Sequence, residues 1–201
     1  MRVSTHPLPS AAAVSAAEYL ARERATKDKH EYYDGAITAM AGASLAHNRI
    51  VVNIVTEIGS FLKGKPCEIL PSDIRVSTPF RSAYLYPDAT IVCGAPQMED
   101  DKFDTLRNPK VIFEVLSPST ADHDRRKKFS YYCQIPSFRE YILIDSTDYF
   151  IEFSRRQPDG TWDQDASSDP GGFLRIDSIR ATIPVEEIYR NVFIRAERRT
   201  V

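Results

Sequence analysis

The chain has 201 residues, of which 42% are hydrophobic and 27% are charged, a composition typical of one globular domain with a substantial core. Its 26 basic and 28 acidic residues give a formal net charge of -2. This charge excludes a protein that coats DNA through a strongly positive field, although nucleic acid remains open as a substrate. The three cysteines show no C-x-x-C spacing, which argues against a disulfide framework or a zinc ribbon and favours a reducing cytoplasm.

We expect no targeting signal in the N-terminal region. Pro7 and Pro9 interrupt its alanine-rich run and no long apolar stretch follows, so we expect neither a signal peptide nor a transmembrane span. We therefore expect residues 1–14 to form a loose segment and residues 15–201 to form a single domain. The protein is expected to be cytoplasmic and to have no membrane partner.

The first predicted elements are two helices separated by a hairpin. Good helix formers and alternating charges predict a short helix over residues 15–26. Asp34-Gly35 then marks the turn of a hairpin. Over residues 44–64 the apolar side chains recur at three- and four-residue steps and Gly64 ends the pattern, which predicts a long helix.

The remaining elements alternate between strands and short helices. Three strands are predicted first, beginning at Cys67, Leu85 and Pro109. After them we expect a helix over 122–133, a buried strand over 140–145, an edge hairpin over 148–164 and a short helix over 183–190. From residue 44 to residue 145 the order is thus helix, three strands, helix, strand. It predicts an α+β (or α/β) fold, a small mixed sheet flanked by helices, with peripheral hairpins.

Two carboxylates stand out on the predicted core strands. Asp88 follows Pro87 at the head of the second strand, and Glu114 lies inside the apolar run of the third, where a lone charge is costly to bury. If these strands are neighbours, the two acids meet and repel unless a proton or a cation lies between them. Carboxylate oxygens suit Mg²⁺ or Mn²⁺ better than zinc, so the pair predicts a metal site for phosphate chemistry.

The helix after the glutamate strand offers a cation for this site. Asp124, Lys128 and Tyr132 recur at four-residue spacing and therefore share one helical stripe. A lysine near a metal-bound water can orient it and stabilise charge in the transition state. We expect Lys128 in this role and Asp124 as the residue that positions it. Lys127 points about 100° away and cannot serve the same site.

Several segments together resemble a known family. They are EYYDGAITAMAGASLAHNRI, YPDATIV, EVLSPST, DRRKKFSYY and PSFREYILID, in this order over about residues 15–190. The chain resembles the Uma-two family, which is catalogued as candidate restriction endonucleases and as domain of unknown function 820, within the PD-(D/E)XK nuclease superfamily. The resemblance implies a restriction-endonuclease-like core, a divalent metal, and Asp88 and Glu114 as its ligands.

The resemblance also indicates further site residues and one departure. The superfamily usually has a lysine two positions after the glutamate, where this chain has Leu116; Lys128 stands where the closer family keeps a lysine, so we take it as the replacement. Asp73 matches a recurrent family acid and is a third candidate metal ligand. His47 matches a family histidine and is a candidate for contact with substrate or with a ligand carboxylate.

Each candidate also has a purely structural interpretation. Asp88 can be a turn residue and Asp73 a capping or solvent-facing one, while Glu114 can pair with a buried cation. The Asp124–Lys128 pair can be an exposed salt bridge, and His47 an ordinary helix residue. Ser117 and Thr120 are expected to cap the following helix or to contact phosphate. Two cationic clusters, Arg125 to Lys128 and Arg155 with Arg156, are either solvated or in contact with a phosphate backbone.

The leading functional hypothesis is a metal-dependent endonuclease that cuts DNA through a metal-activated water, with Mg²⁺ or Mn²⁺ as cofactor. A homodimer is expected because each active site cuts one strand of a duplex. The alternative is a nuclease-fold module whose catalysis has decayed and which acts in binding or regulation; Leu116 and the net charge of -2 favour it. A third reading is a hydrolase of small nucleotides, which would need a closed pocket.

Overall fold

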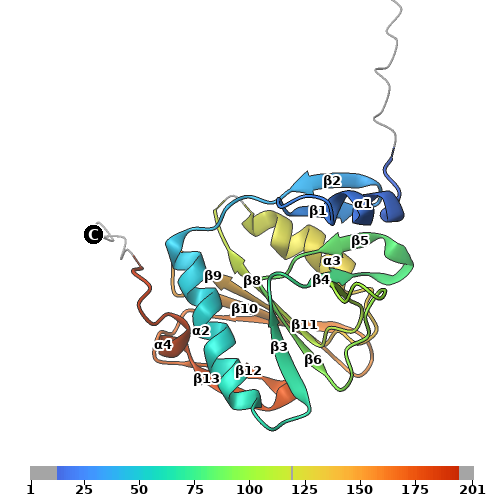
Figure 1. Ribbon diagram of the computed structural model, residues 1–201. Coiled ribbons are helices and arrows are strands. Elements are labelled where there is room, and N and C mark those ends of the chain that lie inside the picture. The colour runs from blue at the N-terminus through green and yellow to red at the C-terminus, as the bar shows by residue number, and fades with distance from the viewer. Residues whose placement is uncertain (1–12, 119, 195–201) are drawn as a thin grey trace, which may run out of the picture.

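The computed structural model describes residues 13–118 and 120–194, so the loose segment expected over residues 1–14 lies almost wholly outside the described residues. The core is a six-stranded mixed sheet in the order β11-β10-β9-β8-β6-β3, in which only β8 and β9 run parallel (Figure 1). Its strands are β3 (Cys67–Pro71), β6 (Ala89–Cys93), β8 (Val111–Leu116), β9 (Glu140–Asp145), β10 (Ile151–Arg156) and β11 (Trp162–Ser167).

The sheet is buried on both faces because its central strands are apolar on both sides. All six residues of β8 are buried. Val111, Phe113 and Val115 pack with helix α2 (Leu45–Leu62), whose apolar stripe includes Ile50, Ile54 and Ile58. The opposite face of β8, with Ile112 and Leu116, packs against Tyr132, Phe138 and Tyr141. Glu114 shares this second face by alternation, so it points into an aromatic layer.

The predicted order of helix, three strands, helix and strand is confirmed by α2, β3, β6, β8, the helical segment after β8, and β9. That segment differs from expectation in its geometry, because η2 (His123–Lys128) is π-helical and only α3 (Phe129–Tyr132) is α-helical. Single π-helical turns are often found at functional sites. The remaining helices are α1 (Ala16–Glu23), η1 (Pro79–Arg81), η3 (Asp177–Ile179) and α4 (Val185–Ile188).

A second sheet combines the hairpin that was predicted to be peripheral with some strand residues that the sequence pattern had joined to the core. Its order is β2-β1-β5-β4-β7, with β1 (His30–Tyr33), β2 (Ala36–Ala39), β4 (Arg75–Ser77), β5 (Ala83–Leu85) and β7 (Thr105–Leu106). The strand predicted from Cys67 turns after Pro71 and continues in the second sheet as β4. The strand predicted from Leu85 is likewise divided between the sheets. Leu85 is the last residue of β5, and the chain then crosses to the core sheet, where it forms β6. Asp88 lies in this crossing between β5 and β6.

The two predicted hairpins are confirmed. β1 and β2 pair around Asp34 and Gly35, which both have positive φ as a tight hairpin turn requires. β10 and β11 form the hairpin at the edge of the core sheet, with Asp159-Gly160 between them. A third, two-stranded sheet of β12 (Phe173–Ile176) and β13 (Ala181–Pro184) follows and packs with α2. No helix of the described residues is long and apolar enough to span a membrane.

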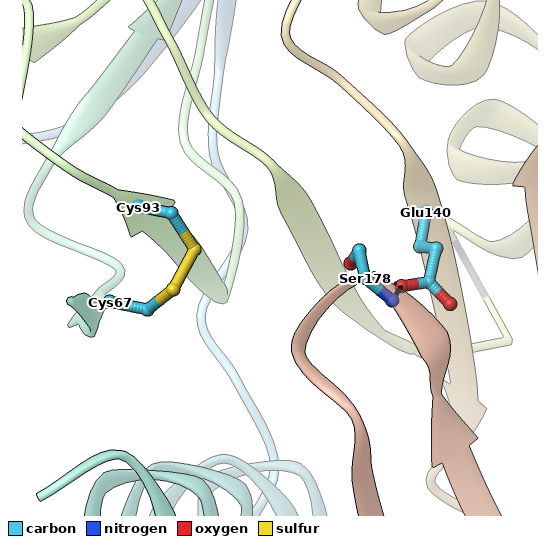
Figure 2. Close-up of a disulfide and its surroundings, with 4 residues drawn as sticks. All are labelled: Cys67, Cys93, Glu140 and Ser178. Carbon is cyan, nitrogen blue, oxygen red and sulfur yellow. Dashed lines mark hydrogen bonds between the residues drawn. A yellow bond between two sulfur atoms is a disulfide. The ribbon is translucent and has the colours of Figure 1, made fainter. Parts of the chain in front are cut away.

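The expectation that the cysteines stay unpaired is wrong. Cys67 and Cys93 face each other in the register of β3 and β6 and form a disulfide (Figure 2). The sequence could not show this pairing, because it depends on which strands are neighbours. Cys133 is free.

Glu140, also drawn in Figure 2, joins the start of β9 to the turn after β12. Its carboxylate accepts hydrogen bonds from the backbone N–H groups of Asp177 and Ser178 at 3.0 and 2.9 Å, and from the Ser178 hydroxyl. Arg155 lies 3.2 Å from the same carboxylate. Because its charge is met by these donors, buried Glu140 has a structural role.

The second sheet is tied to α1 by ion pairs around Asp104. Arg24 binds Asp104 at 2.8 Å and Arg75 lies 2.5 Å from the same carboxylate. The Arg24 and Arg75 guanidinium groups hold the pKa of Asp104 well below its usual value, although partial burial opposes them.

We expect Asp104→Asn to destabilise the fold by about 2 kcal/mol at neutral pH, because hydrogen bonds to charged groups contribute roughly this much. A depressed carboxyl pKa stabilises the fold above the unfolded pKa, and this contribution is lost as pH falls through the folded value. The difference between variant and wild type should therefore shrink below about pH 4. Chemical denaturation at several pH values measures this difference in unfolding free energy.

Asp100→Asn is the control. It removes an ion pair with Arg24 but leaves the ion pair between Arg75 and Asp104 in place, so it should destabilise the fold less. An equal loss of stability would contradict the shared role of Asp104.

Candidate active site

Glu114 finds its partners on the helical segment that covers the second face of β8. Lys128 Nζ donates to Glu114 Oε2 at 3.1 Å, and the Tyr132 hydroxyl donates to Oε1 at 3.0 Å. All three side chains are buried. The structural interpretation, in which a buried glutamate pairs with a cation, thus describes the arrangement seen here, and both carboxylate oxygens are engaged.

Lys128 is shared among three acids. Its Nζ lies 3.1 Å from Glu31 Oε1, 3.1 Å from Glu114 Oε2 and 3.3 Å from Asp124 Oδ1. An ammonium group has three protons to donate, so these three carboxylates can take all of them. The predicted pair of Asp124 and Lys128 is confirmed as a contact, but the alternative that it lies exposed on the helix surface is wrong, because both side chains are buried.

The charged groups of this cluster shift one another's pKa values. Burial raises the pKa of Glu114 well above its usual value, and the carboxylates of Asp124 and Asp88 add to the shift while Lys128 opposes it. Burial alone would lower the pKa of Lys128, but Glu114, Glu31 and Asp124 outweigh burial and raise it. Lys128 therefore remains an ammonium ion.

Lys127 and Lys128 point in different directions, as the helical spacing predicts. Lys127 Nζ lies 4.0 Å from the centre of the Tyr33 ring, a cation–π contact at an exposed side chain. Only Lys128 reaches the strand that carries Glu114.

Asp88 lies opposite Glu114 at the crossing between the two sheets. The register pairs Ala89 with Phe113, which places Asp88 across from Glu114 one step further along. The backbone N–H of Val115 donates to Asp88 Oδ2 at 2.7 Å, and His47 Nε2 lies 3.1 Å from the same oxygen. Within the described residues, Asp88 Oδ1 makes no hydrogen bond or ion pair. One carboxylate oxygen is therefore available to a ligand.

His47 is held at this point by the start of α2. The Ser44 side chain caps the helix and accepts the N–H of His47 at 3.1 Å. The side chains of His47 and Asp88 are 15% and 16% exposed, so this half of the site is partly accessible to solvent while the Glu114 half is buried. The expected contact of His47 with a ligand carboxylate is thus present in the structure.

Asp73 is not brought to the other acids. Its side chain is 86% exposed in the turn after β3 and pairs with Lys29 at 2.5 Å. Among the described residues it makes no hydrogen bond or ion pair with Asp88 or Glu114. Its predicted role as a metal ligand has no support from these contacts.

The remaining predicted residues lie at the entrance to the helical segment. The hydroxyl oxygens of Ser117 and Thr120 are 3.1 Å apart, and the Ser117 carbonyl accepts the N–H of Ala121 at 3.0 Å. Arg125 pairs with Glu152 of β10 at 2.6 Å. Because Arg125 is paired and Lys128 is buried, the run of four cations is not one continuous basic surface.

Glu31, Tyr33 and His123 also belong to the cluster, and the sequence analysis missed all three. The Tyr33 hydroxyl donates to Glu31 Oε2 at 2.6 Å and lies 2.6 Å from His123 Nε2. One signal for Glu31 was available: like Glu114, it is an acid inside a short strand beside bulky aromatic residues. Its partner Lys128, however, is almost a hundred positions away in the chain.

Comparison with known proteins shows the family of the chain. A family model described as "Putative restriction endonuclease", Uma2, matches residues 16–185. Two uncharacterised proteins of Synechocystis sp. are similar: sll1609 is 36% identical over 74% of this chain and 84% of its own length. The second, slr1290, is 35% identical over 89% and 93%.

A solved structure shares the fold. The crystal structure of "a putative nuclease belonging to DUF820" from Anabaena variabilis aligns with a TM-score of 0.71 at 17% identity, over 88% of this chain and 97% of that one. At this identity the likeness shows the α+β fold alone. The family model covers most of the chain, and the chain belongs to the Uma2 family.

Proposed function

We propose that the chain is a divalent-metal-dependent endonuclease that hydrolyses DNA phosphodiester bonds. The observation that carries this proposal is the register of β6 and β8, which sets Asp88 across from Glu114, together with the ion pair between Glu114 and Lys128. Membership of a family described as restriction endonucleases supports it.

The donor set fits Mg²⁺ or Mn²⁺ in its chemistry. Asp88 Oδ1 has no partner among the described residues, the Asp88 side chain is 16% exposed, and Glu114 lies across from it in the register. The described residues contain no group of three or more His, Cys, Asp or Glu side chains that could hold a metal, but Mg²⁺ commonly uses one or two carboxylates and keeps several waters. The buried Nδ1 of His47, which has no hydrogen-bond partner among the described residues, indicates further polar demand beside Asp88.

In this proposal Asp88 and Glu114 hold the ion, which would lower the pKa of a bound water and stabilise charge on the phosphate. Val115 N–H and His47 hold Asp88 Oδ2 and leave Oδ1, which has no partner among the described residues, for the ion. Asp73 remains a proposed third ligand that would first have to leave Lys29.

Lys128 can help only after a rearrangement. With three carboxylates within 3.3 Å, its ammonium has no proton left for water or phosphate. When Glu114 turns toward the metal ion, one N–H of Lys128 loses its acceptor and can donate a hydrogen bond to a phosphate oxygen or to the oxygen of the bound water, without transfer of the proton. In the resting arrangement all three N–H groups of Lys128 are therefore engaged by carboxylates, and the release of one of them is part of the proposed reaction.

The alternative is a binding or regulatory module whose catalysis has decayed. Leu116 in place of the usual lysine, and the full engagement of Lys128 by carboxylates at rest, favour it. In that case the cluster is a buried ion-pair network that holds the second sheet on the core.

We expect the purified protein to nick or cut supercoiled plasmid or single-stranded DNA with Mg²⁺ or Mn²⁺ and to lose this activity in EDTA. Gel assays on both substrates, with calorimetric titration of Mn²⁺ in parallel, test the proposal. Absence of both cleavage and Mn²⁺ binding would select the decayed module.

The proposal extends to assembly and location. Cleavage of both strands of a duplex by so small a chain favours a two-fold homodimer, and we propose a cytoplasmic location, where the chain would meet its DNA substrate. Sedimentation at micromolar concentration should give twice the chain mass; a monomer that still makes double-strand cuts would contradict the dimer.

A further inference from the structure

Glu31 is the most firmly held of the three acids around Lys128. It lies on β1 of the second sheet with its side chain buried. The backbone N–H of Tyr86 donates to Oε1 at 3.1 Å, and Lys128 lies 3.1 Å from the same atom. The Tyr33 hydroxyl donates to Oε2 at 2.6 Å. Both oxygens are thus fixed, by contacts from three different segments.

The Tyr33 contact is itself directed by His123. Tyr33 has one hydroxyl proton, and it is given to Glu31. The 2.6 Å contact between Tyr33 and His123 Nε2 must therefore be donated by the histidine. His123 and Lys128 are the first and last residues of η2, so the chain of contacts from His123 through Tyr33 and Glu31 to Lys128 starts and ends on the same helical segment.

The three acids are not equivalent partners of Lys128. Glu114 has to be free to bind the proposed metal ion. Asp124 is on the same helical segment as Lys128 and moves with it. Glu31 alone among the three belongs to the second sheet. It can hold Lys128 in place while Glu114 turns away.

We propose that Glu31 is a positioning residue that keeps Lys128 at the site independently of Glu114, with Tyr33 and His123 fixing its orientation. The inference rests on the proposed role of Lys128. It also gives the second sheet a function. Strand β1 carries Glu31, and the backbone N–H of Tyr86, just after β5, holds the Glu31 carboxylate next to Lys128.

Glu31→Gln tests this inference against Glu23→Gln, a matched control. Glu23 is also buried beside Tyr86 and accepts its hydroxyl at 2.9 Å, and the N–H of His30 at 2.9 Å, but it makes no ion pair with Lys128. The first readout needs no metal and no DNA: acylation of Lys128 in the native protein, followed by mass spectrometry. We expect about tenfold faster labelling in Glu31→Gln, as loss of one charged hydrogen bond implies, and no change in Glu23→Gln.

The second readout is steady-state cleavage. Glu31→Gln should lower kcat about tenfold or more with little change in KM, because the lysine is misplaced only for the chemical step. If Lys128 labelling does not rise, or rises equally in the control, Glu31 does not position it. If labelling rises selectively but the wild type cuts no DNA, positioning stands and the endonuclease proposal fails.

Tyr33→Phe is a second variant, which tests the same inference if Glu31→Gln does not fold. It removes only the hydroxyl that orients Glu31 and keeps the ring. Selective labelling of Lys128 should still increase, by about threefold; unchanged labelling would overturn the inference.

Discussion

Asp88→Asn is expected to abolish metal-dependent cleavage while the chain stays folded. Asparagine keeps the volume, and its side-chain oxygen can still accept the Val115 N–H, but it lacks the charge that holds a divalent cation. Loss of about 4 kcal/mol of transition-state stabilisation corresponds to roughly a thousandfold in rate. Single-turnover cleavage with Mn²⁺ measures the effect, and thermal unfolding verifies the fold.

Asp145→Asn is the control for this substitution. Asp145 ends β9, beside Leu116 at the end of β8, and its carboxylate accepts the backbone N–H and hydroxyl of Thr147, each at 2.7 Å. It should cut DNA like the wild type. Equal activity of Asp88→Asn and Asp145→Asn would rule out Asp88 as a metal ligand and favour the decayed module.

The core sheet could be predicted because its information is local. An apolar run such as that of β8 is buried on both faces wherever it is placed, and the α2 stripe repeats at helical spacing. The crossings at Pro71 and near Pro87 could not be predicted in the same way. The residues on both sides are extended, and the sheet that each joins depends on distant partners.

The candidate site was predictable where its residues share an element or lie on consecutive core strands. Asp88 and Glu114 come from neighbouring strands, and Lys128 from the stripe of the next helical segment. Glu31 escaped prediction because it comes from a hairpin that appeared peripheral. Its contact with Lys128 exists only once the second sheet packs on the core.

Lys128→Met is expected to stop turnover and to make the stability of the metal-free protein strongly dependent on pH. Removing the one cation leaves three buried carboxylates together, and breaking a buried ion pair typically costs about 3–5 kcal/mol. Their folded pKa values should rise above the unfolded ones, so stability is fully present below about pH 4 and is lost as pH rises. Denaturation at acidic and alkaline pH, without metal, measures this slope.

The matched control is Lys127→Met. Its ammonium contacts the Tyr33 ring and lies in solvent, so its removal should change stability by less than about 1 kcal/mol and weaken DNA binding modestly and in a salt-dependent way. Mn²⁺ separates the two variants further. A divalent ion can neutralise the acids that Lys128 leaves behind, so it should raise the melting temperature of Lys128→Met more than that of the wild type. If the two variants instead behave alike, with mild effects and no added response to Mn²⁺, Lys128 is not the cation around which the three acids are assembled, and its catalytic role fails with it.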